Sequence, residues 1–485
     1  MDRTVDLIII AVYLISVAIL GIVSGGKSKS ARDYFLGAKS VPWWAVCFSI
    51  VAAETSTLTF ISIPGLAYLT NMNFLQVTFG YFIGRVIVAF FFLPAYYKGD
   101  MTTAYAYLNN RFGNKTRSFA SIVFLFTRTA ADGVRLFATA IPLKLMLDIS
   151  YPVAIIVIAA IALIYTYIGG VRGVIWVDVI QMFIYIGGAI LAIGFLLTEF
   201  VPGGFASVMN IASAEGKNAI FNSGFNLSIS GFFSTPYTLL GGLLGGAFLS
   251  MASHGTDQLI VQRLLTIKNL KNSQKAIIGS GAIVIVQFAV FLFVGLCLYA
   301  FYGTYDLGSI GLAKADEIFP FFIINSLPVG VSGIIIAGLF AAALSTLAGS
   351  ISSLSSSTML DLYKPLVKVS DELKELKISR LFTIMWAVLL VGAALIFMES
   401  PDTVVELALS IASFTYGGLL GTFMLGLIVK KAEEKDALIG FSAGILIMVL
   451  IISLNLVGWT WYTFIGVVAT VSVGKTVNII RKRIA

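Results

Sequence analysis

The sequence has little charge and only two cysteines, and each scarcity excludes a class of protein. Charged residues make up 12% of its 485 positions, whereas 58% are hydrophobic. A soluble protein of this length needs more charge to solvate its surface. Cys47 and Cys297 both lie inside apolar runs, so no disulfide framework is expected.

Several sequence patterns are also missing. No metalloprotease motif, nucleophile elbow or Walker sequence occurs, so we do not expect a membrane enzyme. The period-two alternation of an outer-membrane barrel is absent as well. What the sequence does contain is apolar runs of about 20 residues, the length that crosses a bilayer as a helix. These runs predict an all-α integral membrane protein.

About thirteen apolar runs are long enough to span a membrane. The first, residues 5–24, is interpreted as a retained helix, because no strongly basic stretch precedes it and no small-residue cleavage site follows it. The thirteen predicted spans lie near residues 5–24, 41–69, 75–97, 118–147, 151–169, 174–198, 236–254, 276–302, 331–359, 379–398, 404–430, 437–456 and 460–478.

Basic residues gather in alternate loops between these runs. Arg263 and three lysines follow the seventh run, for example, whereas the intervening loops contain little beyond Lys217 and Lys314. The positive-inside rule then places the N-terminus outside and the C-terminus in the cytoplasm of a cell membrane. The net charge of +8 therefore serves topology, and no nucleic-acid partner is expected.

Ionisable residues inside a span are costly and need a partner or a function. Arg128, Asp132 and Arg135 fall at i, i+4 and i+7 of one run, so they share a helix face. The three residues together have one net positive charge. Glu54, Asp178 or an anionic solute could balance that charge.

Two further cations inside spans have simpler explanations. Lys144 lies near the outer end of its run and can extend to the interface. Arg85 has no acidic neighbour in its own run. We therefore expect Arg85 to pair across helices in a structural role.

The second and ninth runs have oxygen-rich segments. The second run contains VAAETSTLTFISIPG, in which clustered hydroxyl residues are followed by Pro64. This pattern predicts local unwinding of the helix, which frees backbone carbonyls for a cation. Hydroxyl-mediated helix packing is the alternative. On the ninth run Ser345 and Thr346 offer hydroxyls, with the Ala342 carbonyl one turn back. Hard cations need several such oxygens, and the two runs together can supply them.

Five motifs occur in the order found in one transporter family. They are ARDYFLGAKSVPWW, GRVIVAFFFLPAYY, YIGGVRGVIWVDVIQ, GTDQLIVQR and AAALSTLAGSISSLSSSTMLDLY. Over nearly its whole length the chain resembles the sodium/solute symporter family. The resemblance implies one transmembrane domain, 1–485, with a leucine-transporter-like fold. Residues 41–198 and 236–430 would form inverted five-helix repeats, with 5–24 and 437–478 as peripheral helices.

The resemblance also implies a function and an ion site. The chain would be a sodium-coupled secondary active symporter, working as a monomer in the lipid bilayer by alternating access. Its main sodium ligands would be Ala52, Thr55, Ala342, Ser345 and Thr346. Some members hold a second sodium, for which Asp178 matches the aspartate and is a possible ion-coupling residue. The two hydroxyl positions of that site are Ala348 and Gly349 here.

Implied solute contacts come from several spans. They are Glu54, Ser56, Thr59, Phe74, Thr78, Arg135, Ser250, Ser253 and His254, the last being the only histidine. Sialic-acid members use an arginine at the position of Ala131 and a threonine at that of Glu54. Proline members have an acidic residue matching Glu54 and a segment similar to that around Arg135. A negative and a positive group in one pocket suit a zwitterion, so a small amino acid is the expected solute.

Other solutes and another class of protein stay open. The alternatives within the family are a sugar, a sialic acid or a monocarboxylate. A channel or a transporter-like sensor is the alternative from another class. Sodium-dependent, saturable uptake separates a symporter from a channel.

Overall fold

The computed structural model describes residues 3–147, 149–303, 308, 312, 314–367, 371–398 and 404–484, and for residues 58, 141–142, 145–147 and 404–414 only the backbone. All secondary-structure elements of the described residues are helices, in agreement with the all-α prediction. The helices are α1 Thr4–Gly25, α2 Ala31–Leu36, α3 Trp43–Glu54, α4 Thr57–Leu69, α5 Leu75–Ile87, α6 Leu93–Lys98, α7 Ala104–Arg111, α8 Asn114–Leu147, α9 Tyr151–Phe195, α10 Gly204–Ala214, α11 Ile229–Ser234, α12 Gly246–Gly255, α13 Gln258–Leu265, α14 Leu270–Tyr302, α15 Ile318–Asn325, α16 Val331–Ser357, α17 Lys364–Val367, α18 Glu372–Phe397, α19 Val404–Ile428, α20 Glu434–Ser453 and α21 Tyr462–Ile484.

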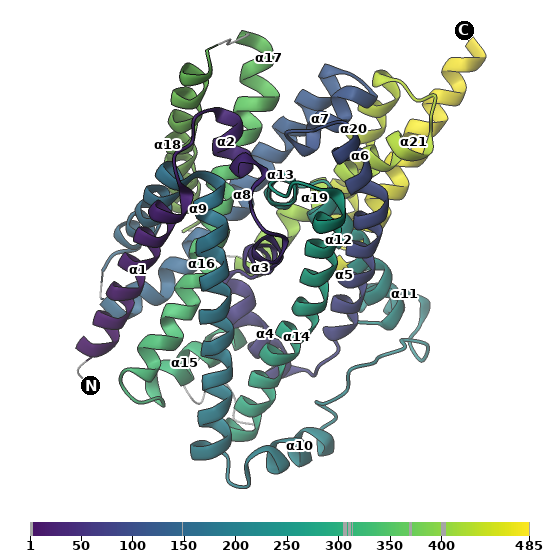
Figure 1. Ribbon diagram of the computed structural model, residues 1–485. Helices are drawn as coiled ribbons and strands as arrows, with labels where there is room; N and C mark the ends of the chain where they lie inside the picture. Colours follow the sequence, from purple (N-terminus) through teal and green to yellow (C-terminus); the bar gives the residue numbers. More distant parts are fainter. Residues whose placement is uncertain are drawn as a thin grey trace.

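Helix α16 lies at the centre of the bundle. Every side chain from Ile335 to Ser357 is buried, because small residues let neighbouring backbones approach closely. A Cβ on Gly338, for example, would lie 3.0 Å from the Cα of Tyr185 in α9. Helices α9, α1, α3 and α8 all contact α16 (Figure 1). Residues on α16 therefore reach several helices at once.

The second predicted span is broken. Helix α3 ends at Glu54 and α4 begins at Thr57, with Thr55 and Ser56 in extended conformation. The unwinding predicted from the hydroxyl-rich segment is confirmed. Pro64 is not its cause, since this proline lies inside α4.

Helix α9 covers two predicted spans, 151–169 and 174–198. Its backbone departs from helical geometry at Gly170, where φ is +57° and ψ is −162°. A Cβ there would lie 2.6 Å from the carbonyl oxygen of Tyr34, so both the conformation and the space require glycine. Beside it, Gly169 and Gly173 contact the backbone of Gly21 in α1.

Eight helices of the described residues are long and apolar enough to cross a membrane, or nine if the bent pair of α2 with α3 counts as a span. The number thirteen stays a prediction. The difference comes from the two halves of α9 counting once, from the broken second span, and from α8, α12 and α19, which are charged or short in their described parts.

Different helices and loops lie at the two ends of the bundle. The N-terminus, α10 and α15 lie at one end, and α2, α7, α17 and the C-terminus lie at the other (Figure 1). The second end contains the basic loops on which the predicted orientation rests.

Candidate functional site

The break after α3 is held by the Thr55 side chain. Its hydroxyl donates to the Val51 carbonyl at 2.9 Å and accepts from Gln287 Nε2 at 2.6 Å and from the Tyr185 hydroxyl at 3.1 Å. The last carbonyls of a helix have no partner within it. With α3 ending at Glu54, the Ala52 carbonyl belongs to this set. The break therefore presents backbone oxygens in the membrane interior.

Oxygens from α16 meet this break. The Thr346 hydroxyl lies 3.5 Å from the Thr55 carbonyl oxygen and 3.2 Å from that of Ala342. The adjacent Ser345 hydroxyl donates to Asp178 Oδ1 at 2.6 Å, which leaves its lone pairs free to face a cation. Three of the five predicted sodium ligands thus make contact here, and Ser345 and Ala52 lie close to them in the chain. These neutral oxygens suit a hard monovalent cation.

Asp178 is fully buried and is paired with an arginine that the sequence pattern placed in a loop. Arg263 counts among the cytoplasmic charges by hydropathy, but it is only 2% exposed on α13. Its Nη2 donates to Asp178 Oδ2 at 3.0 Å. Hydropathy ended the seventh span near residue 254, where α12 does end, but it missed the short buried helix α13 that follows. The motif GTDQLIVQR, in which an aspartate and an arginine occur together, was the available signal.

Glu54 also has a partner. The Arg85 guanidinium donates to its carboxylate, and His254 Nε2 lies 3.7 Å from the same carboxylate. Arg85 is fully buried and 16% of the Glu54 side chain is exposed. The cross-helix pairing predicted for Arg85 is confirmed. The negative charge of Glu54 is therefore already balanced by the protein.

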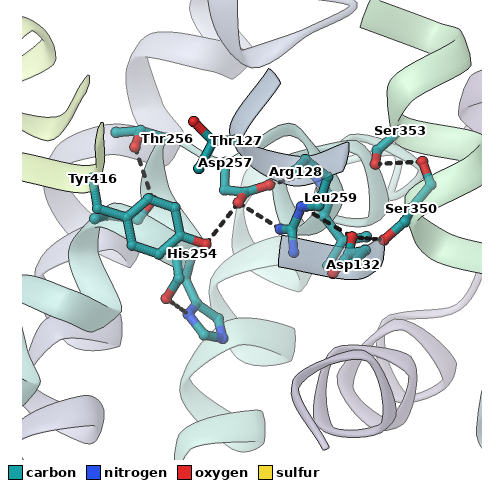
Figure 2. Close-up of polar contacts among 12 residues, drawn as sticks. Thr127, Arg128, Asp132, His254, Thr256, Asp257, Leu259, Ser350, Ser353 and Tyr416 are labelled. Atoms are coloured by element: carbon teal, nitrogen blue, oxygen red, sulfur yellow. Dashed lines mark hydrogen bonds and ion pairs between the residues drawn. The ribbon is translucent and has the colours of Figure 1, made fainter. Parts of the chain in front are cut away.

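Both arginines on α8, Arg128 and Arg135, are balanced too, and Figure 2 shows the partners of Arg128. Arg128 Nη2 lies 2.5 Å from Asp257 Oδ2, and the Tyr416 hydroxyl donates to the same oxygen at 2.9 Å. Asp132 pairs with Arg135 at 2.6 Å and accepts from Ser350. The extra positive charge was expected to meet Glu54, Asp178 or the solute. That expectation was wrong, because Asp257, in the motif after the seventh span, neutralises it.

A small cavity adjoins both the break after α3 and the Arg135 side chain of α8. It is lined by Ser56, Thr57, Arg135 and Thr346, among others, and holds about 10 Å³, room for about one water molecule. Arg135 is 24% exposed, and among the described residues none accepts from its Nε. A solute needs these walls to part before it can enter.

The other predicted solute contacts do not line this cavity. Phe74 stacks on Phe288 with ring centroids 5.0 Å apart, and the Thr78 hydroxyl donates to the Leu75 carbonyl. Ser253 Oγ lies 2.8 Å from His254 Nδ1. The two remaining predicted contacts are Thr59, half-buried on α4, and Ser250, buried on α12.

Known proteins are similar to this chain in sequence over most of its length. The family model described as the sodium:solute symporter family matches residues 34–444. A sodium/sialic acid symporter of Aliivibrio fischeri is 31% identical over 97% of this chain and 92% of its own. One of Proteus mirabilis is 30% identical over 90% and 86%. Other relatives are named for vitamins, monocarboxylates or glucose.

A solved structure matches the whole fold. The substrate-bound, outward-open state of a Na⁺-coupled sialic acid symporter, described as revealing a novel Na⁺ site, superposes with a TM-score of 0.88 at 28% identity. The match covers 98% of this chain and 97% of that one. A nucleobase-cation symporter, at 12% identity and a TM-score of 0.58, shares the fold alone.

Proposed function

This chain belongs to the sodium:solute symporter family, and on that basis we propose that it imports an anionic, carboxylate-bearing solute together with sodium. Sodium-coupled symport is the activity of the family. The solute class we propose is a sialic acid or a similar organic acid. This replaces the zwitterionic amino acid expected from the sequence.

Arg135 and Glu54 are both ion-paired, and the unused N–H of Arg135 carries this proposal. Arg135 has an unpaired Nε and is partly exposed at the cavity. A guanidinium with a free N–H is a good donor to a carboxylate. Glu54, which was to bind the ammonium of a zwitterion, is instead paired with buried Arg85. An ammonium would have to compete with a guanidinium that is already in place.

The rest of the cavity suits a hydroxylated solute. Ser56 and Thr57 line it beside Arg135, and hydroxyls both donate and accept. Sialic-acid symporters are among the relatives with the highest sequence identity. The resemblance to sialic-acid members implies that their carboxylate-binding arginine falls at the position of Ala131, one helical turn before Arg135. A carboxylate displaced by about one turn, ~5 Å, would reach Arg135.

For sodium we propose the oxygens of Ala52, Thr55, Ala342, Ser345 and Thr346. Such an ion would join the break after α3 to α16. Thr346 belongs to both places, since its hydroxyl contacts the Thr55 carbonyl oxygen and its side chain lines the Arg135 cavity. Ion binding that fixes Thr346 therefore fixes one wall of the solute cavity, which couples the two cargoes.

Thermal unfolding of the purified protein tests this proposal. We expect sialic acid or lactate to raise the unfolding midpoint in sodium buffer, whereas proline and glucose should not. Arg135→Gln should remove the solute effect and keep the effect of sodium. Thr129→Ala, on the same helix with its hydroxyl bonded to the Leu125 carbonyl, is the matched control. Stabilisation by proline that is lost in Glu54→Gln would restore the zwitterion interpretation.

A further inference from the structure

A second cavity lies next to the first, and Arg135 lines both of them. The second cavity holds about 20 Å³, and its walls include Ala131 of α8 and Leu419 of α19. Arg128, Asp257 and Tyr416 line it as well. The Arg135 guanidinium is therefore a wall that the two cavities share.

The second cavity lies on the side of Arg135 that faces the basic loops. Helix α8 begins at Asn114, directly after α7, at the end of the bundle that contains these loops (Figure 1). Arg128 comes two helical turns before Arg135, which places it about 10 Å nearer that end. In the predicted orientation this is the cytoplasmic side.

Three side chains close the second cavity on this side. Asp257 Oδ2 accepts from Arg128 Nη2 at 2.5 Å and from the Tyr416 hydroxyl at 2.9 Å (Figure 2). The contact joins α8, the N-cap of α13 and α19. The Arg128 side chain is only 8% exposed and that of Asp257 2%, so a solute cannot pass while the contact holds.

The contact can open without leaving an unpaired charge. Asp257 Oδ1 accepts from the Leu259 backbone N–H at 2.9 Å and caps α13 independently of Oδ2. Arg128 Nε lies 3.6 Å from Asp132 Oδ2, so this arginine keeps a counter-charge. Asp132 in turn accepts from Ser350 of α16, the helix that contains the proposed sodium ligands. A buried charge is costly chiefly when it loses every partner, and neither charge does so here.

We propose that Arg128, Asp257 and Tyr416 form the gate through which the solute leaves toward the cytoplasm, with the second cavity as its exit compartment. The inference rests on the proposed function, in which Arg135 binds the carboxylate of the solute. Because this guanidinium lines both cavities, the carboxylate passes from one to the other beside the same counter-charge. Separation of Tyr416 and Arg128 from Asp257 then opens the path.

Cysteine labelling in membrane vesicles tests the gate without any solute. Ala131→Cys in the full chain places a thiol on the wall of the second cavity, and both native cysteines are buried. An impermeant methanethiosulfonate is applied in sodium buffer to inside-out and to right-side-out vesicles. Tyr416→Phe in this background removes one donor and keeps the ring. We expect it to speed labelling in inside-out vesicles about tenfold, the effect of losing one hydrogen bond to a charged group, and not in right-side-out vesicles.

Two further variants separate the gate from general damage. Thr422→Val on the same helix removes a hydroxyl that bonds only the Gly418 carbonyl one turn back, and it should label at the parent rate. Asp257→Asn keeps a side-chain oxygen to cap α13 and loses the charge that holds Arg128, so it should also speed labelling from the inside. Thermal unfolding shows which variants are folded.

The outcomes distinguish the gate from the proposed solute. Unchanged labelling in folded Tyr416→Phe would overturn the gate, whether or not Asp257→Asn folds. Equal acceleration in both kinds of vesicle would overturn it too, because that result indicates a loosened bundle. Acceleration from the inside alone, with no stabilisation of the protein by sialic acid or lactate, would support the gate and refute only the proposed solute class.

Discussion

At the scale of single residues, Ser345 and Thr346 have different tasks although they are adjacent. Thr346 faces the broken span, and Ser345 faces Asp178. Donation to a carboxylate fixes the rotamer of the Ser345 hydroxyl, and a fixed ligand costs less entropy to bind an ion. The sequence shows two adjacent hydroxyl residues, but it does not show that they contact different partners.

The double variant Ser345→Ala with Thr346→Ala should lose sodium binding. A ligand present at a hundred times its Kd stabilises a protein by about 2.7 kcal/mol, and this stabilisation should disappear in a sodium titration of the unfolding midpoint. Ser355→Ala, whose hydroxyl bonds within α16, should keep it. A normal sodium shift in the double variant would contradict the proposed ligands.

Glu54→Gln should reduce stability more than it reduces solute affinity. It leaves the fully buried Arg85 without its counter-charge, which typically costs about 3–5 kcal/mol. Replacing Arg85 with Met in the same chain should recover part of the loss. The check is the unfolding midpoint, measured beside the solute Kd. A specific loss of solute affinity at unchanged stability would assign Glu54 to the solute instead.

At the scale of elements, hydropathy predicted the long apolar helices but missed the short buried helix α13 after the seventh span. It predicted the helices from 5–24 onward because each buries an apolar face in lipid or protein. Helix α13 is only eight residues long and contains Gln258, Gln262 and Arg263, so it is too short and too polar to register as a span. Its burial comes from partners that are distant in the sequence, among them α3 and α16. No local pattern contains that information.

The candidate site, too, was predictable from the sequence only in part. The break at Thr55 and the oxygens of α16 were predictable, because unusual polarity inside an apolar run is visible in sequence. The partners of Glu54 and Arg128 were not, since Arg85 lies on another helix and Asp257 is the N-cap residue of α13. The zwitterion expectation depended on those unknown partners.

Gly170→Ala should prevent correct folding of α9. A non-glycine residue in this backbone conformation costs about 1–3 kcal/mol, and its Cβ would also meet the Tyr34 carbonyl oxygen at 2.6 Å. Gly187→Ala is the matched control, because it lies on the same helix with no atom within 4 Å of its Cβ. The yield of monodisperse protein after extraction should fall sharply for the first and stay near the wild type for the second. Equal yields would show that the break is not needed.

At the scale of the whole molecule, the orientation in the membrane is open to a direct test. Both native cysteines are buried, so background labelling should be low. Ala214→Cys in α10 and Lys374→Cys in α18 are exposed positions predicted to lie on opposite sides. An impermeant maleimide should label position 214 in intact cells and position 374 only after permeabilisation. The reverse pattern would invert the topology.

Ala348 and Gly349 lack the hydroxyls of a second ion site, so we expect one sodium per cycle, and this ratio sets how strongly the protein can concentrate its cargo. An anion of single charge that enters with one sodium moves no net charge. The membrane potential, worth about 2.3 kcal/mol per charge per 100 mV, then does no work on the cycle. Accumulation is limited to the sodium gradient, so about a tenfold sodium ratio, or ~1.4 kcal/mol, sustains about a tenfold solute ratio. A cell using this protein accumulates the acid by keeping its internal sodium concentration low. A change of membrane potential alone leaves the uptake of the acid unaltered.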